Sequence, residues 1–174
     1  MSKYKKLFTI CFFFFLFFPL ASHEFQLYTA DSLAVGKISE YTQGTLGHGA
    51  SFTYEIPDFD LIAVTAKLEH AINILDSYSF ATSWNSIIFS LGAQSRFEIT
   101  DFLNINPGVD FGICVNMLRP KTLTENVYMD PLVQLSCSFV FYNFAVTPFY
   151  RVYPEKNNVG QYAGLNLGII IDID

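Results

Sequence analysis

Residues 103–117 read LNINPGVDFGICVNM, and apolar and polar side chains alternate through the whole stretch. Every odd position from Leu103 to Met117 is apolar, and every even position is Asn, Gly, Asp or Cys. Successive side chains of a β-strand point to opposite faces of its sheet. A period of two residues therefore predicts a strand with one apolar face and one polar face.

The same period recurs on both sides of this stretch and predicts an all-β fold. With 103–117, the expected strands number about eight; the others lie near 25–36, 49–56, 61–70, 86–99, 132–141, 144–153 and 161–173. The connections between them alternate in length: 37–47, 72–84, 119–130 and 154–159 are longer, whereas those near 57–60, 100–102 and 142–143 are tight. This order predicts an antiparallel up-and-down β-barrel with one plain rim and one elaborated rim.

The first 22 residues, MSKYKKLFTICFFFFLFFPLAS, are typical of a secretory signal peptide. Lys3, Lys5 and Lys6 precede an apolar run of about 15 residues that ends in small side chains, which is short for a spanning helix. We expect cleavage after Ala21 or Ser22, with 23–174 as the barrel. No later run is long enough for a transmembrane helix, so the exported chain is either soluble outside the cytoplasm or a membrane barrel.

Composition excludes two broad classes of protein. Aromatic residues make up 17% of the chain and charged residues 15%, whereas disordered chains are rich in charge and poor in aromatics. The formal net charge is −6, and a nucleic-acid-binding protein would carry a basic surface. We therefore expect a folded chain that does not bind nucleic acid.

Charged residues of the seven clearer strands all lie on the polar face. We assign them to the barrel interior: Glu55, Lys67, Glu69, Arg96, Glu98, Asp110, Arg151 and Asp172. Inside a narrow barrel each charge needs a partner, so we expect ion pairs there. A conduit for small solutes is the alternative interpretation of the same residues.

The apolar face is assigned to lipid. Its residues are Phe52, Val64, Leu68, Phe89, Leu91, Val109, Phe111, Ile113, Leu135, Phe139, Val146, Leu167 and Ile169. In a soluble barrel the two faces would be exchanged, and alternation alone does not distinguish the two cases. The length of the apolar stripes, the Gly, Ser and Asn of the opposite face and the aromatic residues near strand ends favour the membrane.

A signal peptide, about 150 further residues, alternating strands and this order of connections resemble the small outer membrane β-barrel proteins of the OmpX, OmpA-barrel and OmpW kind. The resemblance is architectural and rests on no sequence motif. It implies location in the bacterial outer membrane, with membrane lipid and the barrel assembly machinery as partners. Function would lie in the extracellular loops, with Lys37–Leu46 and Asn73–Trp84 as candidate contacts for a host or extracellular ligand.

No motif indicates an enzyme, a metal site or a cofactor. His23, His48 and His70 lack metal-ligand spacing, and Cys114 and Cys137 fall on opposite faces, which disfavours a disulfide. His70 could belong to a lipid-modifying site on the barrel surface, but the sequence offers no catalytic triad around it. We therefore expect a structural or surface-interaction role. The alternatives are a narrow OmpW-like barrel that passes small molecules and a soluble lipocalin-like binding barrel.

Overall fold

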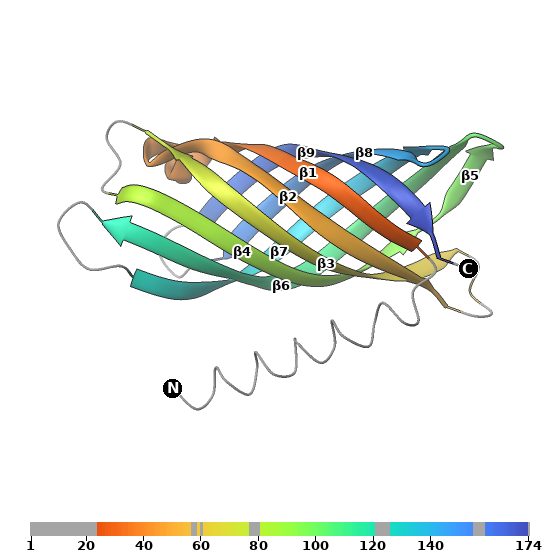
Figure 1. Ribbon diagram of the computed structural model, residues 1–174, viewed down its shortest axis with the longest axis horizontal. Coiled ribbons are helices and arrows are strands. Elements are labelled where there is room, and N and C mark those ends of the chain that lie inside the picture. Colours follow the sequence, from red (N-terminus) through yellow and green to blue (C-terminus); the bar gives the residue numbers. More distant parts are fainter. Residues whose placement is uncertain are drawn as a thin grey trace, which may run out of the picture.

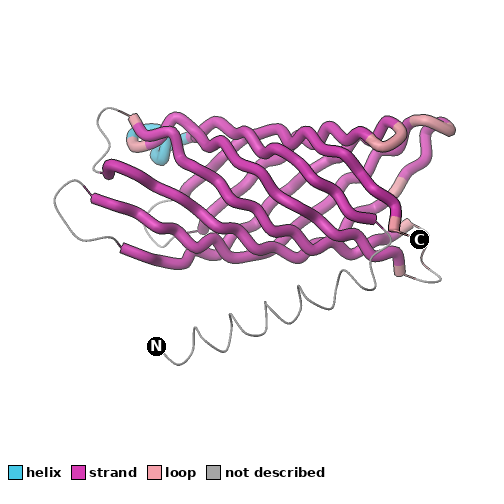
Figure 2. The backbone as a smooth tube through the Cα atoms, in the orientation of Figure 1, coloured by secondary structure: helices cyan, strands magenta, loops and turns pink. Residues whose placement is uncertain are grey.

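The computed structural model describes residues 24–56, 59, 61–76, 81–120, 126–154 and 159–173. These residues form a single antiparallel sheet that closes on itself, as Figures 1 and 2 show. The strands are β1 (Glu24–Val35), β2 (Thr42–Glu55), β3 (Ile62–Leu75), β4 (Ala81–Ser95), β5 (Phe97–Thr100), β6 (Leu103–Pro120), β7 (Asn126–Phe141), β8 (Phe144–Pro154) and β9 (Val159–Asp172). The expected signal peptide, 1–22, lies outside the described residues.

The barrel has eight strands, because β4 and β5 are two parts of one strand. Gln94 of β4 pairs with Gly108, and Phe97 of β5 pairs with Ile105, so both parts share one register with β6. Each strand pairs with its neighbour along the chain, and pairing of β1 with β9 completes the ring. The predicted eight-stranded antiparallel up-and-down barrel is confirmed.

The registers also give the tilt of the strands. A path of directly paired residues starts at Glu24, passes once around the barrel and returns to β1 at Ala34, ten residues further along. With eight strands about 4.8 Å apart and about 3.3 Å per residue, this shift corresponds to a tilt of about 40°. Such a barrel is narrow enough for side chains to fill its interior.

The strand ends on either side of the tight connections lie at one end of the barrel, called here the turn end, and the other strand ends lie at the opposite end, called the loop end (Figure 1). At the loop end β1 and β2 are joined by a short 3-10 helix, η2 (Gly36–Glu40). No helix among the described residues is long and apolar enough to cross a membrane.

Strands extend further toward the loop end than the sequence indicated. The expected connection 37–47 is strand from Thr42 onward, and the expected connection 72–84 contains the ends of β3 and β4. Glycine caused the first error, because it usually marks turns. Here Gly44 lies close to the neighbouring strand: a Cβ at this position would lie 1.9 Å from the backbone oxygen of Ser32.

Pro148 lies in the middle of β8, where it cannot donate to a sheet ladder. Pairing with β7 is interrupted between Phe149 and Val146, and the register is unchanged on either side of the gap. The hydroxyls of Ser138 and Thr147 hydrogen-bond at 2.7 Å across the gap. The ladder is therefore broken locally without a bulge.

Candidate functional site

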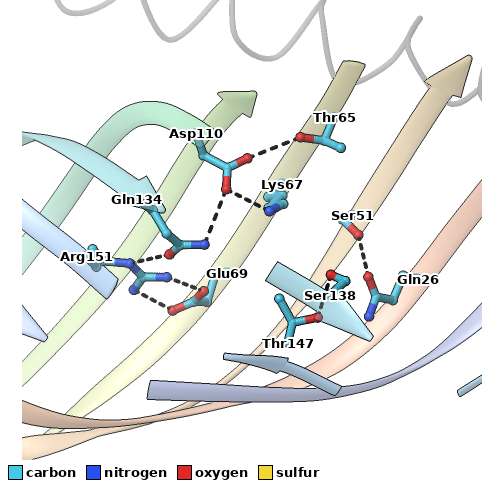
Figure 3. Close-up of polar contacts among 10 residues, drawn as sticks. All are labelled: Gln26, Ser51, Thr65, Lys67, Glu69, Asp110, Gln134, Ser138, Thr147 and Arg151. Atoms are coloured by element: carbon cyan, nitrogen blue, oxygen red, sulfur yellow. Dashed lines mark hydrogen bonds and ion pairs between the residues drawn. The ribbon is translucent and has the colours of Figure 1, made fainter. Parts of the chain in front are cut away.

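A buried ion pair crosses the barrel interior from β3 to β8 (Figure 3). The two guanidinium NH groups of Arg151 donate to the two carboxylate oxygens of Glu69, each at 2.8 Å. Both residues are only 3% exposed. Arg151 Nε also donates to Gln134 Oε1 at 2.8 Å, so the guanidinium is held from two sides. A bidentate, charge-assisted pair is the geometry that best offsets the desolvation of two buried charges.

A second charge, Asp110, is joined to this pair through Gln134. The Gln134 amide donates to Asp110 Oδ2 at 3.3 Å, and Lys67 Nζ donates to the same oxygen at 2.7 Å. Thr65 donates to Asp110 Oδ1 at 3.1 Å. We call the six residues Thr65, Lys67, Glu69, Asp110, Gln134 and Arg151 the lumen network. It links β3, β6, β7 and β8 (Figure 3).

The registers bring these residues together. Thr65, Asp110, Gln134 and Arg151 belong to one path of directly paired residues, which passes through Gly92 between the first two. A Cβ at Gly92 would lie 2.2 Å from Asp110 Oδ1. Glycine therefore provides the space into which the carboxylate turns.

The lumen network separates two cavities. The one toward the loop end has a volume of about 170 Å³ and includes Arg151 in its wall. The one toward the turn end has a volume of about 30 Å³ and includes Thr65 and Lys67. The latter is large enough for one or two water molecules. Each cavity thus ends at the network.

The turn-end cavity is lined mainly by small and amide side chains. Ser51 donates to Gln26 at 3.2 Å, while the side-chain oxygens of Asn106 and Asn166 are buried and accept no hydrogen bond from the described residues. These oxygens are natural partners for buried water. Near the rim, Arg96 pairs with both Glu24 and Glu55, joining the start of β1 to the end of β2.

The loop-end cavity has aromatic walls. Trp84, Tyr128, Tyr153 and Tyr162 line it, and the rings of the last two meet edge-to-face with centroids 5.7 Å apart. Ile38 of η2 packs against the buried cluster that contains Trp84, so the 3-10 helix lies over the mouth of the barrel.

A chain of hydrogen bonds runs through the same cavity. Asn116 is its centre: the Oδ1 atom accepts from Trp84 Nε1 at 2.8 Å and from Ser86 at 2.7 Å, and Nδ2 donates to Asp130 at 2.7 Å. Asn73 donates to Ser86 at 3.2 Å. The polar groups are therefore held in place while the aromatic rings leave space between them. A cavity of this kind suits a small group with a flat apolar face and a hydrogen-bonding edge.

The structure places the charged residues assigned to the interior at three depths. Glu69, Asp110 and Arg151 are buried in the lumen network, and Lys67 is half-buried beside them. Arg96 and Glu55 form an ion pair near the turn end. Glu98 and Asp172 are exposed at the turn end. Glu98 lies on β5, which extends beyond β3, and Asp172 is the last residue of β9. The lumen network does not include these two.

Residues assigned to lipid all lie on the outward face, and none is buried. Exposed fractions reach 59% for Phe111 and Ile169 and 58% for Leu135. They pair with one another across strands, as Phe111 does with Leu91 and Val109 with Leu135. These apolar side chains cover most of the outward face of their strands.

The sequence assigned part of the loop-end cavity to loops. Asn73 and Trp84 were interpreted as the bounds of a loop, but both are buried strand residues that line the cavity. Likewise, Thr42 to Leu46 belong to β2. The signal that could have located Asn73 was its parity, because it continues the odd-numbered inward positions of β3.

Potential reactive groups do not assemble into a metal centre. Among the described residues no group of three or more His, Cys, Asp or Glu side chains could hold a metal ion. Cys114 faces inward and is buried, whereas Cys137 is half-buried on the outward face, and both are free thiols. His48 and His70 face outward on neighbouring strands and are directly paired.

Comparison with known proteins identifies the architecture. Neither a family model nor a curated protein sequence matches the chain. Neisserial surface protein A is similar with a TM-score of 0.64 and 12% identity, over 86% of this chain and 96% of that one. Ail, the attachment invasion locus protein of Yersinia pestis, is similar with a TM-score of 0.56 and 12% identity, over 86% of this chain and 99% of that one. The N-terminal barrel domain of Pseudomonas aeruginosa OprF is similar with a TM-score of 0.54 and 14% identity, over 86% of this chain and 98% of that one. The predicted resemblance to small outer membrane β-barrels is confirmed for the fold.

Proposed function

We propose that this chain is an integral outer membrane β-barrel that serves as a closed scaffold and recognises a partner at its loop end. The observation that carries the proposal is the distribution of polarity across the barrel wall. The buried charges point inward, among amide, hydroxyl and small side chains and the aromatic residues of the loop-end cavity. Most of the side chains that point outward are large and apolar. Insertion would require the barrel assembly machinery, and outer membrane lipid would cover the apolar surface.

A water-soluble barrel has the opposite arrangement. Its apolar side chains form the core, and its charges face solvent. Here Asp110 is 2% exposed, while Leu135, on the neighbouring strand, is 58% exposed. Exposed apolar surface of this extent is unfavourable in water and favourable in hydrocarbon. The lipocalin-like alternative is therefore disfavoured.

A transport role is disfavoured by the lumen network. A solute passing along the barrel axis would have to separate Glu69 from Arg151 and Asp110 from Lys67. Removing the partner of a buried charge costs roughly 3–5 kcal/mol. We therefore expect the resting barrel not to conduct.

Recognition is assigned to the loop end because the larger cavity opens there. The loops alone were the expected site, but the aromatic and amide side chains that could hold a ligand come from strands. Lys37 and Ile38 of η2 complete the mouth of this cavity. We expect the partner to insert a small aromatic or otherwise flat group that hydrogen-bonds near Asn116. This role needs no catalytic step, and we propose a non-enzymatic protein.

Cell fractionation with gel analysis tests the membrane assignment. We expect the chain in the outer-membrane fraction, with a folded band that changes mobility on boiling. Recovery in the soluble fraction without a mobility change would refute the membrane proposal.

A planar-bilayer recording tests whether the barrel is closed. We expect no steady conductance from the wild-type chain. Stable ion conductance would favour the narrow transport barrel instead.

Fluorescence of Trp84, the sole tryptophan, tests the recognition site. Small phenols and indoles titrated into the folded protein should change its emission, and the Asn116→Ala variant should weaken the response at least tenfold. Equal responses from the two proteins would exclude Asn116 from the site.

A further inference from the structure

The outward surface is interrupted by one group of polar side chains on β1, β2 and β3. Thr29 of β1 pairs directly with His48 of β2, which pairs directly with His70 of β3. The two imidazole rings lie with centroids 5.3 Å apart at an angle of 61°. Asp31 lies two residues beyond Thr29 on the same face of β1 and is exposed. We call Thr29, Asp31, His48 and His70 the outward polar patch.

Apolar side chains lie above and below this patch on the same three strands. Toward the loop end, Leu33 is 71% exposed, Leu46 54% and Ile72 52%. Toward the turn end, Leu27 is 52% exposed and Leu68 37%. The patch therefore sits within the apolar outer surface and not at its rim.

Within the barrel the patch lacks partners for its ionisable groups. The Asp31 side chain makes no hydrogen bond or ion pair with any other described residue, and the described ring contact of each histidine is the other ring. A carboxylate and two imidazoles directed at hydrocarbon are unfavourable unless another polar group covers them. No described residue of this chain supplies such a group.

We propose that a second copy of this chain covers the patch, in a symmetric dimer whose two-fold axis runs along the membrane normal. The inference rests on the proposed membrane location. In a two-fold dimer of barrels inserted in the same orientation, the axis must run along the membrane normal, and residues at equal height then face each other. The heights of Asp31, His48 and His70 along the barrel are therefore the decisive quantity.

The registers give those heights. At a tilt of about 40°, one residue along a strand rises by about 2.5 Å, and one step to the next strand, from β1 toward β2, rises by about 3 Å. His70 is two strand steps from Thr29, about 6 Å higher. Asp31 is two residues from Thr29 along β1, about 5 Å higher. Asp31 and His70 therefore lie at nearly the same height, on either side of His48.

This arrangement is self-complementary. A two-fold axis near His48 brings Asp31 of one copy opposite His70 of the other, and the reverse pair forms at the same time. Each carboxylate gains an imidazole donor, and the histidines at the centre face each other. A single surface thus supplies both halves of the contact, as an isologous interface requires.

Disulfide trapping tests the geometry in the membrane. His48→Cys is introduced into a Cys137→Ser background, and the matched control is Phe111→Cys, an exposed outward residue on β6, across the barrel. Oxidation of outer-membrane vesicles should link more than half of the His48→Cys chains as dimers and few of the Phe111→Cys chains. Equal cross-linking of both variants, or none of either, would overturn the proposal.

Exchange of the two charges tests the pairing. Asp31→His and His70→Asp alone should each weaken dimerisation in detergent micelles at least tenfold by analytical ultracentrifugation, and the double exchange should restore it to within threefold. Failure of the double exchange to restore it would refute the pairing. If a variant does not fold, Asp31→Asn and His70→Gln replace it, and weakening by either supports the pairing while unchanged association refutes it.

The boiling shift of each variant separates the two proposals. A chain that remains in the soluble fraction contradicts the membrane location, whereas a folded, inserted barrel that stays monomeric contradicts only the dimer.

Discussion

Replacement of Arg151 by methionine should destabilise the barrel strongly, because Glu69 would keep its charge without its partner. Both residues are 3% exposed, so water does not replace the two lost hydrogen bonds. Breaking a buried pair in this way costs about 3–5 kcal/mol. Glu69→Met should cost a similar amount, because it leaves the guanidinium with Gln134 as its remaining side-chain acceptor.

The double variant, Glu69→Met with Arg151→Met, should be more stable than either single variant. It removes both charges and leaves mainly Gln134 Oε1 without its donor, a loss of about 1–3 kcal/mol. The coupling energy between the two sites should therefore be several kcal/mol and favourable. Such a pattern would identify desolvation of an unpaired charge as the dominant effect.

Urea unfolding in phospholipid vesicles provides the assay, with Trp84 fluorescence as the signal and the boiling shift as a second measure. Arg119→Met, at an exposed position near the end of β6, is the matched control and should change the free energy of unfolding by less than about 0.5 kcal/mol. Single variants that cost less than about 1 kcal/mol would refute the reasoning. The interior would then be hydrated, and the network would not be a barrier to solutes.

Three further perturbations test other parts of the structure. Gly92→Ala should impair folding, because the added Cβ would lie 2.2 Å from Asp110 Oδ1; the measurement is the fraction of chain whose gel mobility changes on boiling. Gly160→Ala, where the nearest atom is 3.5 Å away, should fold like wild type. Equal folding yields of the two variants would contradict the tight fit at Gly92. Phe111→Arg or Val109→Arg should reduce insertion by about 2–4 kcal/mol if this face meets lipid, whereas Phe111→Leu should not; vesicle insertion assays measure this, and tolerated arginines would place the face elsewhere. Cys137 should react with a lipid-soluble maleimide in the folded protein while Cys114 stays protected until unfolding, and mass spectrometry showing early labelling of Cys114 would contradict its burial.

The sequence predicted the strands and their faces because one physical rule governs both. A strand that separates lipid from a narrow polar interior must alternate, and 103–117 do so without interruption. The same rule assigned Glu69, Asp110 and Arg151 to one face before their contacts were known. It could not predict which charge meets which, because Glu69 and Arg151 are 82 residues apart and meet only through the registers of a closed barrel.

The sequence analysis was wrong where a residue is chosen for its contacts with a neighbouring strand and not for its propensity to form a strand. Gly44 and Gly47 are typical of a loop, yet in β2 each lies where a Cβ would come within 3 Å of a neighbouring strand. Gly49, within the expected strand 49–56, leaves space for the Tyr28 ring. The loop-end cavity was missed because its walls combine residues of η2 and of β2, β3, β4, β6, β7, β8 and β9, which are far apart in the sequence.

The outward polar patch follows a different logic from the interior charges. Glu69 and Arg151 fit the alternation of polar inward and apolar outward side chains, because both members of the pair lie in the barrel interior. Asp31, His48 and His70 lie at outward positions, where the alternation predicts apolar side chains, but they are polar. No described residue supplies an ion-pair partner for Asp31. Isolated polar residues on a lipid-facing surface destabilise insertion, so a group that contains both acceptors and donors at one height is informative. If the outward face meets lipid, this departure from the pattern indicates where the proposed dimer contact lies.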